Sequence, residues 1–248
     1  DGDPDVLTAS GADDTINWYR NAASLSYVEV VRDGVDDVDG LVGVRDVVVS
    51  NDGQHVYAAS GTDNAVSVFS RNTTTGALSF VEAHIDAADG VEGLAGASAV
   101  AISADDSLVH VTGATDQEVA TFSRNASNGK LRFNASIDDG SDDWLDNVSD
   151  VLVAPSGGDV YTTSPDGDAV GVLHTETEFL LPAVIHSAAD TARNVYATDL
   201  DGDGDTDVLT AAYVDDAIIW YQNLGASNTF SAHTITTAVD GAQDVFAI

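Results

Sequence analysis

The sequence predicts an all-β fold, and more specifically a five-bladed β-propeller with strand-swapped closure between the N- and C-termini. Three observations predict it. Short runs rich in β-branched and aromatic residues alternate with turn residues, and no sustained helical period is present. One strand pattern returns five times at a period of about 50 residues, which is typical of propeller blades. The two ends of the chain carry complementary pieces of one repeat.

Each repeat opens on an apolar strand and continues with up to three more strands. The opening strands are expected to begin near residues 45, 98, 149, 193 and 243. Second strands follow a turn, over residues 56–60, 108–113, 160–163 and 208–213. Third strands are expected over residues 65–70, 118–123, 169–173 and 217–222. A weaker fourth strand closes most repeats, for example over residues 78–84 and 131–137.

The termini determine the expected number of blades. Residues 1–8 match residues 203–210, and residues 14–21 match residues 216–223. The N-terminus therefore enters a blade at its second strand, and the C-terminus stops after a first strand. We expect residues 245–248 to pair with the strands of residues 1–33, since this closure removes two exposed sheet edges. The expected result is a single domain over residues 1–248. A fragment of a longer repeat protein is the alternative, because the chain starts inside a motif.

Composition limits the classes of partner. The chain has 42 acidic against 8 basic residues and a formal net charge of −34. Such a surface repels nucleic acid and anionic membranes, and it suits high salt, where screening weakens self-repulsion. With no cysteine there is no disulfide framework. No apolar run has the length of a membrane span. The start at Asp1 without Met indicates a processed product. We expect a secreted or cell-surface monomer.

The most informative stretch is residues 199–207, where five aspartates occupy alternate positions with glycines between them. This spacing is typical of a calcium-binding loop, in which carboxylates and a backbone carbonyl surround one hard cation. The expected ligands are the carboxylates of Asp199, Asp201, Asp203 and Asp207 and the carbonyl of Asp205. An EF-hand is excluded, because Thr210 stands where the bidentate Glu would be and a strand follows. The alternative is a solvated acidic turn.

A second, shortened copy of this loop begins the chain. It keeps Asp1, Asp3 and Asp5 but lacks counterparts of residues 199–202. We expect this second metal site to be weak or empty.

Two families resemble parts of this chain. Residues 199–223, and the shortened copy at 1–21, resemble the calcium-binding FG-GAP/VCBS repeats of integrin-type and bacterial surface propellers. Residues 47–80 and 100–133 resemble the repeats of lactonase-like propellers, through Ser50-Asn51-Asp52-Gly53 and the paired Phe-Ser-Arg-Asn segments at 69–72 and 122–125. The first resemblance implies a secreted binding scaffold. The second implies a relation to sugar-lactone hydrolases. Seven blades are usual in both families.

Candidate ligand-binding residues are those just before each innermost strand, because these strands converge on the central channel of a propeller. They are Arg45, Asp46, Ser98, Ser149, Asp150, Arg193, Asn194, Gln243 and Asp244. Two arginines among carboxylates and amides suit a sugar or a carboxylate held by bidentate hydrogen bonds. The alternative is that these side chains pair with one another or cap strands.

No catalytic set can be identified. The six histidines have no zinc-ligand spacing, and no Gly-x-Ser-x-Gly motif is present. Trp18 and Trp220 occupy equivalent third-strand positions and are expected to pack between sheets. Trp144 is expected to anchor an acidic loop, with a cation or sugar site there as the alternative. The leading hypothesis is a non-enzymatic calcium-binding propeller that binds carbohydrate or protein. The alternative is a lactonase-like hydrolase, or another carbohydrate-active enzyme, working at the channel mouth.

Overall fold

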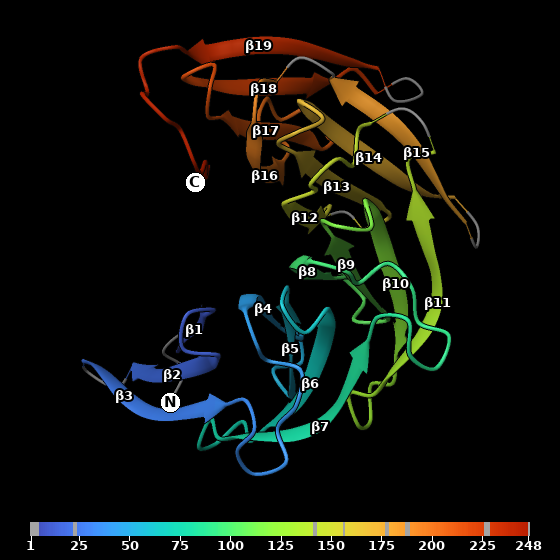
Figure 1. The fold of residues 1–248 in the computed structure, drawn as a ribbon. Coiled ribbons are helices and arrows are strands. Elements are labelled where there is room, and N and C mark those ends of the chain that lie inside the picture. Colours follow the sequence, from blue (N-terminus) through green and yellow to red (C-terminus); the bar gives the residue numbers. More distant parts are fainter. Residues whose placement is uncertain are drawn as a thin grey trace. The chain divides into compact units, whose positions relative to one another are not determined.

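The protein is built of antiparallel sheets. The computed structural model describes residues 5–21, 24–140, 143–155, 157–176, 179–186, 189–225 and 229–247. In these ranges it contains nineteen β-strands in five sheets and no helix, as Figure 1 shows. No helix able to span a membrane is therefore found in the described part of the chain. The predicted all-β class is confirmed.

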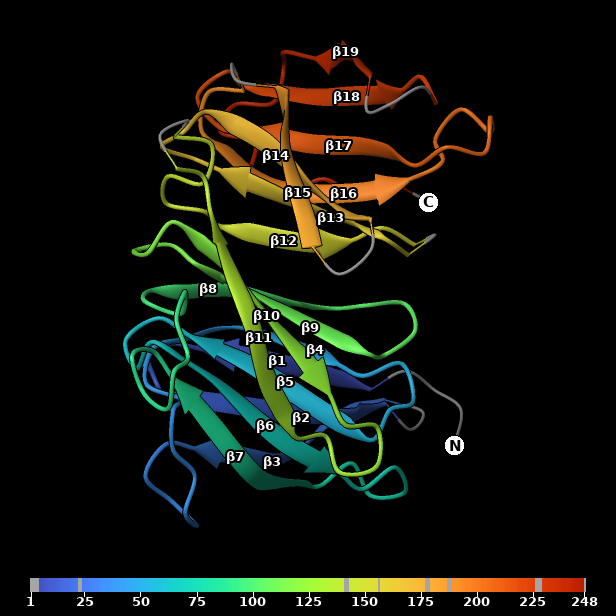
Figure 2. The same cartoon turned by 90° about the vertical axis from the view of Figure 1, so that its right-hand side faces the viewer.

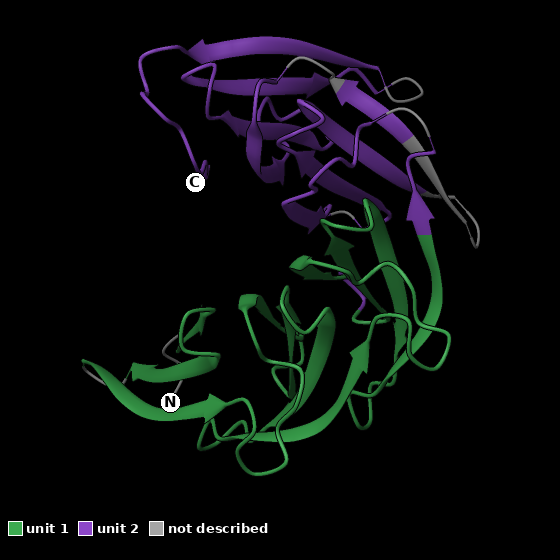
Figure 3. Ribbon diagram, viewed as in Figure 1, with its two compact units in different colours: residues 1–102, 106–136 green, residues 103–105, 137–248 purple. Residues whose placement is uncertain are grey.

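The chain forms two compact units, coloured separately in Figure 3. Unit 1 comprises residues 1–102 and 106–136, and unit 2 comprises residues 103–105 and 137–248. The prediction of one domain over residues 1–248 stays a prediction.

Unit 1 contains three sheets, each wound in chain order. The first has three strands, β1 (Val6–Ser10), β2 (Thr15–Asn21) and β3 (Leu25–Arg32). The second has four, β4 (Val44–Val49), β5 (His55–Ser60), β6 (Ala65–Arg71) and β7 (Leu78–Ile85). The third has β8 (Ala97–Ile102), β9 (Leu108–Gly113), β10 (Glu118–Arg124) and β11 (Leu131–Asp138). In Figure 2 the strands of these sheets carry the labels β1 to β11, in blue to yellow-green.

Unit 2 contains two further four-stranded sheets of the same winding. One consists of β12 (Asp150–Val153), β13 (Asp159–Ser164), β14 (Ala169–Glu176) and β15 (Phe179–His186). The other consists of β16 (Ala192–Thr198), β17 (Asp207–Ala212), β18 (Ala217–Asn223) and β19 (Phe230–Thr236). The strand runs predicted between residues 45 and 222 thus lie within or close to observed strands.

A repeated turn explains why aspartate and asparagine recur between second and third strands. The residue before each third strand has a positive φ, a region that Asp and Asn tolerate better than most side chains. In four of these turns the residue is Asp or Asn, and its side-chain oxygen accepts a hydrogen bond from a backbone N–H in a loop that follows an outer strand; before β10 the residue is Gln117. The donor–acceptor pairs are Gly43–Asp14 at 2.7 Å, Gly96–Asn64 at 2.8 Å, Thr191–Asp168 at 3.0 Å and Gly241–Asp216 at 2.8 Å.

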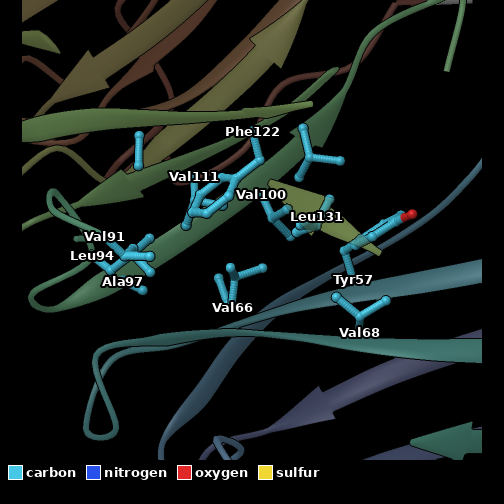
Figure 4. Close-up of a cluster of buried hydrophobic side chains, with 13 residues drawn as sticks. Tyr57, Val66, Val68, Val91, Leu94, Ala97, Val100, Val111, Phe122 and Leu131 are labelled. Carbon is cyan, nitrogen blue, oxygen red and sulfur yellow. The ribbon is translucent and has the colours of Figure 1, made fainter. Parts of the chain in front are cut away.

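The cores lie between neighbouring sheets. In unit 1, Tyr57, Val66 and Val68 of the second sheet pack with Val100, Val111 and Phe122 of the third, as Figure 4 shows. A second cluster joins the first sheet, through Ile16, to Val56 and Phe69. In unit 2, Tyr161 and Val172 pack with Val208 and Tyr221. Adjacent sheets bury each other's apolar faces, as expected of propeller blades.

The fifth predicted inner strand is not formed. Residues 243–247 belong to no strand, and the β1–β2–β3 sheet has three strands. An inner strand needs a second strand to pair with, and no such partner is present for this segment within unit 2. The segment nevertheless has a fixed contact there. The Val245 N–H donates to Asn194 Oδ1 at 3.1 Å, and the rings of Phe246 and Tyr196 lie 5.1 Å apart.

Candidate functional site

Three predicted channel-mouth residues accept backbone hydrogen bonds of one kind, two from the next inner strand and one from the C-terminal segment, and we call these contacts the ladder. Asp46 Oδ2 accepts from the Val100 N–H at 2.9 Å, which joins β4 to β8. Asp150 Oδ2 accepts from the Val195 N–H at 2.9 Å, which joins β12 to β16. Asn194 accepts from the Val245 N–H in the same way. The side chains of Asp46, Asp150 and Asn194 therefore bind backbone N–H groups, which is the strand-capping role given as the alternative to ligand binding.

Each ladder carboxylate also accepts from its own strand. Asp46 Oδ1 takes the Val47 N–H at 2.7 Å, and Asp150 Oδ1 takes the Val151 N–H at 2.9 Å. Burial raises the pKa of Asp46, although the Val100 and Val47 N–H groups oppose this shift. In β8 the residue equivalent to Asp46 is Ala99, whose side chain cannot accept a ladder hydrogen bond.

The arginines that precede the ladder residues are exposed and placed alike within their own sheets. The Arg45 guanidinium lies against Gly61, where a Cβ would come within 2.7 Å of Nε. The Arg193 guanidinium lies over the Tyr213 ring, 4.4 Å from its centroid. Gly61 and Tyr213 both directly follow a second strand. Among the described residues, neither guanidinium makes an ion pair, and both arginines stand at the start of an inner strand.

Hydroxyl groups occupy the equivalent place in the other two described inner strands. Ser98 is buried and lies 2.8 Å from the Thr112 hydroxyl. The Ser149 hydroxyl lies 3.2 Å from that of Thr163 and donates to the Arg193 carbonyl at 3.3 Å. Gln243 and Asp244 are exposed in the segment that forms no strand. Within each unit, the predicted residues thus gather at the same end of the inner strands.

The predicted calcium loop connects β16 to β17. Carboxylate oxygens of Asp199, Asp201 and Asp207 lie within 4.8 Å of one another, a separation suited to one cation. Asp207 is almost completely buried and Asp199 and Asp201 are exposed. The Asp203 carboxylate is not part of this group, and the predicted ligand from Asp205 is its backbone carbonyl, which the carboxylate distances do not test. Asp203 Oδ1 accepts from the Asp205 N–H at 2.9 Å, which tightens the turn. Calcium binding itself stays a prediction.

The second metal loop is only partly described. Asp1 and Asp3 lie outside the described residues. Asp5 Oδ1 accepts from the Asn21 N–H at 3.1 Å, matching the bond from the Asn223 N–H to Asp207 Oδ1 at 2.8 Å. The other Asp5 oxygen pairs with Arg71 at 3.1 Å. A guanidinium therefore already supplies positive charge to Asp5.

A buried arginine network is the feature that sequence reasoning missed. Arg124, at the end of β10, donates to the Tyr57 hydroxyl at 2.7 Å and to Asp52 Oδ2 at 2.8 Å. Although burial acts to raise the pKa of Asp52, hydrogen bonds from Ser50 and Arg124 outweigh it and lower that pKa to about 2. The repeated Phe-Ser-Arg-Asn segment was the available signal. Its partners lie on the neighbouring sheet, which the sequence does not reveal.

A second acidic group was also missed. Carboxylate oxygens of Asp33, Asp39 and Asp63 lie within 4.8 Å of one another. Burial raises the pKa of Asp63, and repulsion from Asp33 and Asp39 adds to the shift. Asp33 and Asp63 accept the Leu41 and Val42 N–H groups at 3.0 and 2.8 Å. These bonds hold the loop that leads into β4, so we assign the group a structural role.

The aromatic residues behave largely as expected. Trp18 is buried, and its ring covers Gly76 on the next sheet. Trp144 is buried against Gly171, which makes it the anchor of its loop. The histidines lie on separate strands and form no catalytic set within the described residues. His110 is buried with the Thr121 hydroxyl 3.0 Å from Nδ1, and His174 Nδ1 lies 2.9 Å from Asp159.

Comparison with known families decides between the two functional hypotheses. Residues 2–142, more than half of the chain, match the family described as lactonase, seven-bladed β-propeller. The chain belongs to the lactonase family. This confirms the lactonase-like part of the predicted resemblance and the propeller type of fold. No curated protein sequence matches the chain.

Solved structures show the same fold at low identity. A proposed 6-phosphogluconolactonase of Bacteroides uniformis superimposes with a TM-score of 0.76 at 17% identity, over 96% of this chain and 69% of that one. The periplasmic gluconolactonase of Pseudomonas aeruginosa gives 0.69 at 18%, over 97% and 68%. A protein of Lactobacillus plantarum gives 0.75 at 13%, over 95% and 69%.

The leading functional hypothesis from the sequence is therefore wrong. A non-enzymatic binding scaffold was inferred from the resemblance of residues 199–223 to calcium-binding surface repeats. The family match covers the other half of the chain and favours the lactonase-like hydrolase that was the alternative. The calcium-type repeat misled because its loop is a local motif, whereas the activity of a propeller depends on residues contributed by several blades.

Proposed function

We propose that the protein is a lactonase-like hydrolase that opens a sugar lactone at the start of its inner strands. The observation that carries this proposal is the pair Arg45 and Arg193. Both are exposed, equivalently placed and without an ion-pair partner among the described residues, in a chain of net charge −34 that belongs to the lactonase family. Cations in so acidic a chain would ordinarily be neutralised by neighbouring carboxylates. Free guanidinium groups instead suit a ligand that brings its own oxygens.

The chemistry requires few protein groups. Water adds to the lactone carbonyl, the ring C–O bond breaks, and the products are a hydroxyl and a carboxylate. Negative charge develops on the carbonyl oxygen in the transition state, and guanidinium donors stabilise it. The same donors hold the carboxylate that forms. The ladder residues Asp46 and Asn194 act indirectly, since their bonds to backbone N–H groups fix the strands that carry the arginines.

Hydrolysis of a panel of aldonolactones, phosphorylated and unphosphorylated, tests the proposal. We expect Arg45→Ala to lower kcat/KM at least about tenfold, the effect of losing one charge-assisted hydrogen bond of about 1.4 kcal/mol in the transition state. Arg132→Ala is the matched control, because Arg132 is an exposed arginine on the outer strand β11. Absence of hydrolysis of every lactone, or equal effects of the two substitutions, would contradict the proposal.

We also propose that the loop between β16 and β17 binds Ca²⁺. The support is the convergence of Asp199, Asp201 and Asp207 together with the burial of Asp207. The cation offsets repulsion among carboxylates that the fold brings together. Its role is structural, as the FG-GAP/VCBS-like spacing suggests.

For the whole chain we propose a five-bladed ring in which residues 243–248 complete the β1–β2–β3 sheet. The support is the Val245–Asn194 bond, which repeats the ladder contact of other inner strands. We further propose that the protein acts as a monomer outside the cytoplasm on a carbohydrate-derived substrate, and that nucleic acid and membrane insertion play no part. The periplasmic relative and the acidic surface support this.

A further inference from the structure

An open groove lies between the outer strands of the first two sheets of unit 1. Its volume is about 520 Å³, which is within the range of ligand-binding sites. The lining residues include Val31 and Val38 on one side and Leu78 and Phe80 on the other. Its charged lining residues are the carboxylates Glu29 and Asp36 and the cation Arg32.

The junction between the second and third sheets, called the second junction, contains an equivalent glutamate whose carboxylate has further partners. Glu29 Oε1 accepts from the Leu78 N–H at 2.7 Å, and Glu82 Oε1 accepts from the Leu131 N–H at 2.8 Å, so the two glutamates are equivalent. At the second junction Lys130 Nζ lies 3.2 Å from Glu82 Oε2, and His84 Nε2 lies 3.2 Å from Glu82 Oε1. The His84 ring also packs on Phe122, with centroids 5.5 Å apart.

The first junction, between the first and second sheets, lacks equivalents of both Lys130 and His84. Ala77 stands in the place of Lys130, directly before the outer strand, and Val31 stands in the place of His84, two residues after the glutamate. Among the described residues, the Glu29 carboxylate accepts only the Leu78 N–H. At the second junction a lysine of the chain itself places its ammonium against the glutamate carboxylate. At the first junction the chain provides no such lysine for Glu29.

The strand beside the groove offers further contacts. β3 pairs with β2 and forms the edge of its sheet among the described strands. It also exposes apolar residues, with Tyr27 56% and Val28 and Val30 each 42% accessible. An edge strand with exposed apolar side chains is a template for an added strand unless charge or a covering element blocks it. An extended segment can hydrogen-bond to such an edge and insert alternate side chains into an adjoining pocket.

We propose that this groove docks an extended, lysine-bearing segment of a partner protein along the free edge of β3. A lysine side chain lays its methylene stem on Leu78 and Phe80 and brings its ammonium to Glu29, as Lys130 does at Glu82. The net charge of −34 favours a basic partner over an acidic one. Apolar residues flanking the lysine cover Val28 and Val30.

The test uses the full chain and the labelled peptide Lys-Val-Lys-Val-Lys, with binding followed by fluorescence anisotropy at low ionic strength. Glu29→Gln removes the charge but keeps an acceptor for the Leu78 N–H. Ala77→Lys supplies an internal ammonium copied from the second junction. We expect each substitution to weaken peptide binding at least about tenfold. Glu29→Gln removes the carboxylate that the peptide ammonium contacts, and the lysine side chain in Ala77→Lys competes for that carboxylate. Asp89→Asn is the matched control, since it removes one exposed carboxylate at the second junction. It should change affinity less than about twofold.

Three outcomes would overturn the proposal. The wild-type chain fails to bind the peptide. Alternatively, Glu29→Gln, Ala77→Lys and Asp89→Asn all bind alike, which would mean attraction to the acidic surface in general. Finally, n-butylammonium displaces the peptide as effectively as unlabelled peptide does, which would make the groove a small-amine site. Circular dichroism of each variant checks that it is folded, and the proposal is supported only by loss of binding in folded variants.

Discussion

His110 shows how a single residue couples this fold to pH. The side chain is 1% exposed in β9, and its described polar contact is the Thr121 hydroxyl. Burial lowers the pKa of His110 to about 4, because the charged imidazolium would lose its water. Arg124, by contrast, keeps its charge in a buried place because Asp52 and Tyr57 take its donors. The third sheet therefore holds one neutral and one charged buried base.

The His110 shift predicts a loss of stability in mild acid. The unfolded chain binds a proton on His110 below its ordinary pKa of about 6.5, whereas the folded chain does not until about pH 4. The contribution of neutral His110 to the free energy of unfolding is therefore complete above pH 6.5. It is lost as pH falls from 6.5 to 4, by an amount of order 2–3 kcal/mol.

The measurement is urea unfolding of wild-type protein and His110→Gln at several pH values. As pH falls from 6.5 to 4, the unfolding free energy of the wild-type protein should decrease relative to that of His110→Gln. A difference that stays constant from pH 7 to pH 4 would show that His110 has the same pKa in the folded and the unfolded protein.

At the scale of elements, the loop between β16 and β17 is the part that a metal should stabilise. Removal of Ca²⁺ by a chelator is expected to lower the melting temperature, since three converging carboxylates then repel one another. Asp201→Ala should remove this calcium dependence. Asp203→Ala should have a smaller effect, because Asp203 lies outside the converging group. Differential scanning calorimetry with and without Ca²⁺ distinguishes these results. Equal melting temperatures in both conditions would show that the loop is an ordinary acidic turn.

Elements were predictable where one strand carries its own signal. Alternating apolar residues placed β5, β9 and β17 within about one residue of their observed limits. The convergence of Asp199, Asp201 and Asp207 was predictable for the same reason, because these residues are close in sequence. Contacts between sheets were not predictable. The partners of Arg124 and the open groove beside Glu29 depend on which residues of the next sheet face them, and a single sequence does not state this.

The last segment illustrates this limit. Residues 243–248 have the pattern of an inner strand, but a strand requires a partner as well as a pattern. Residues 243–247 instead make the ladder contact to Asn194 without joining a sheet. The prediction from local pattern was wrong for the strand, and it stays a prediction for the closure of the ring.

At the scale of the whole molecule, the account depends on a ring of equivalent sheets. The ladder of Asp46, Asp150 and Asn194 positions each inner strand relative to the next one in its unit. Arg45 stands at the start of an inner strand of unit 1, and Arg193 at the start of an inner strand of unit 2. The family description names seven blades, whereas five sheets are described here. Closure by the C-terminal segment therefore underlies both the proposed fold and the proposed active site.

Engineered cross-linking tests this closure most directly. The chain contains no cysteine, so a Leu7→Cys/Phe246→Cys double variant carries one possible disulfide. We predict that mild oxidation joins the two cysteines within one chain, giving a monomer of increased electrophoretic mobility and higher melting temperature. Persistence of two free thiols, or cross-linking only between chains, would contradict the closed five-bladed ring.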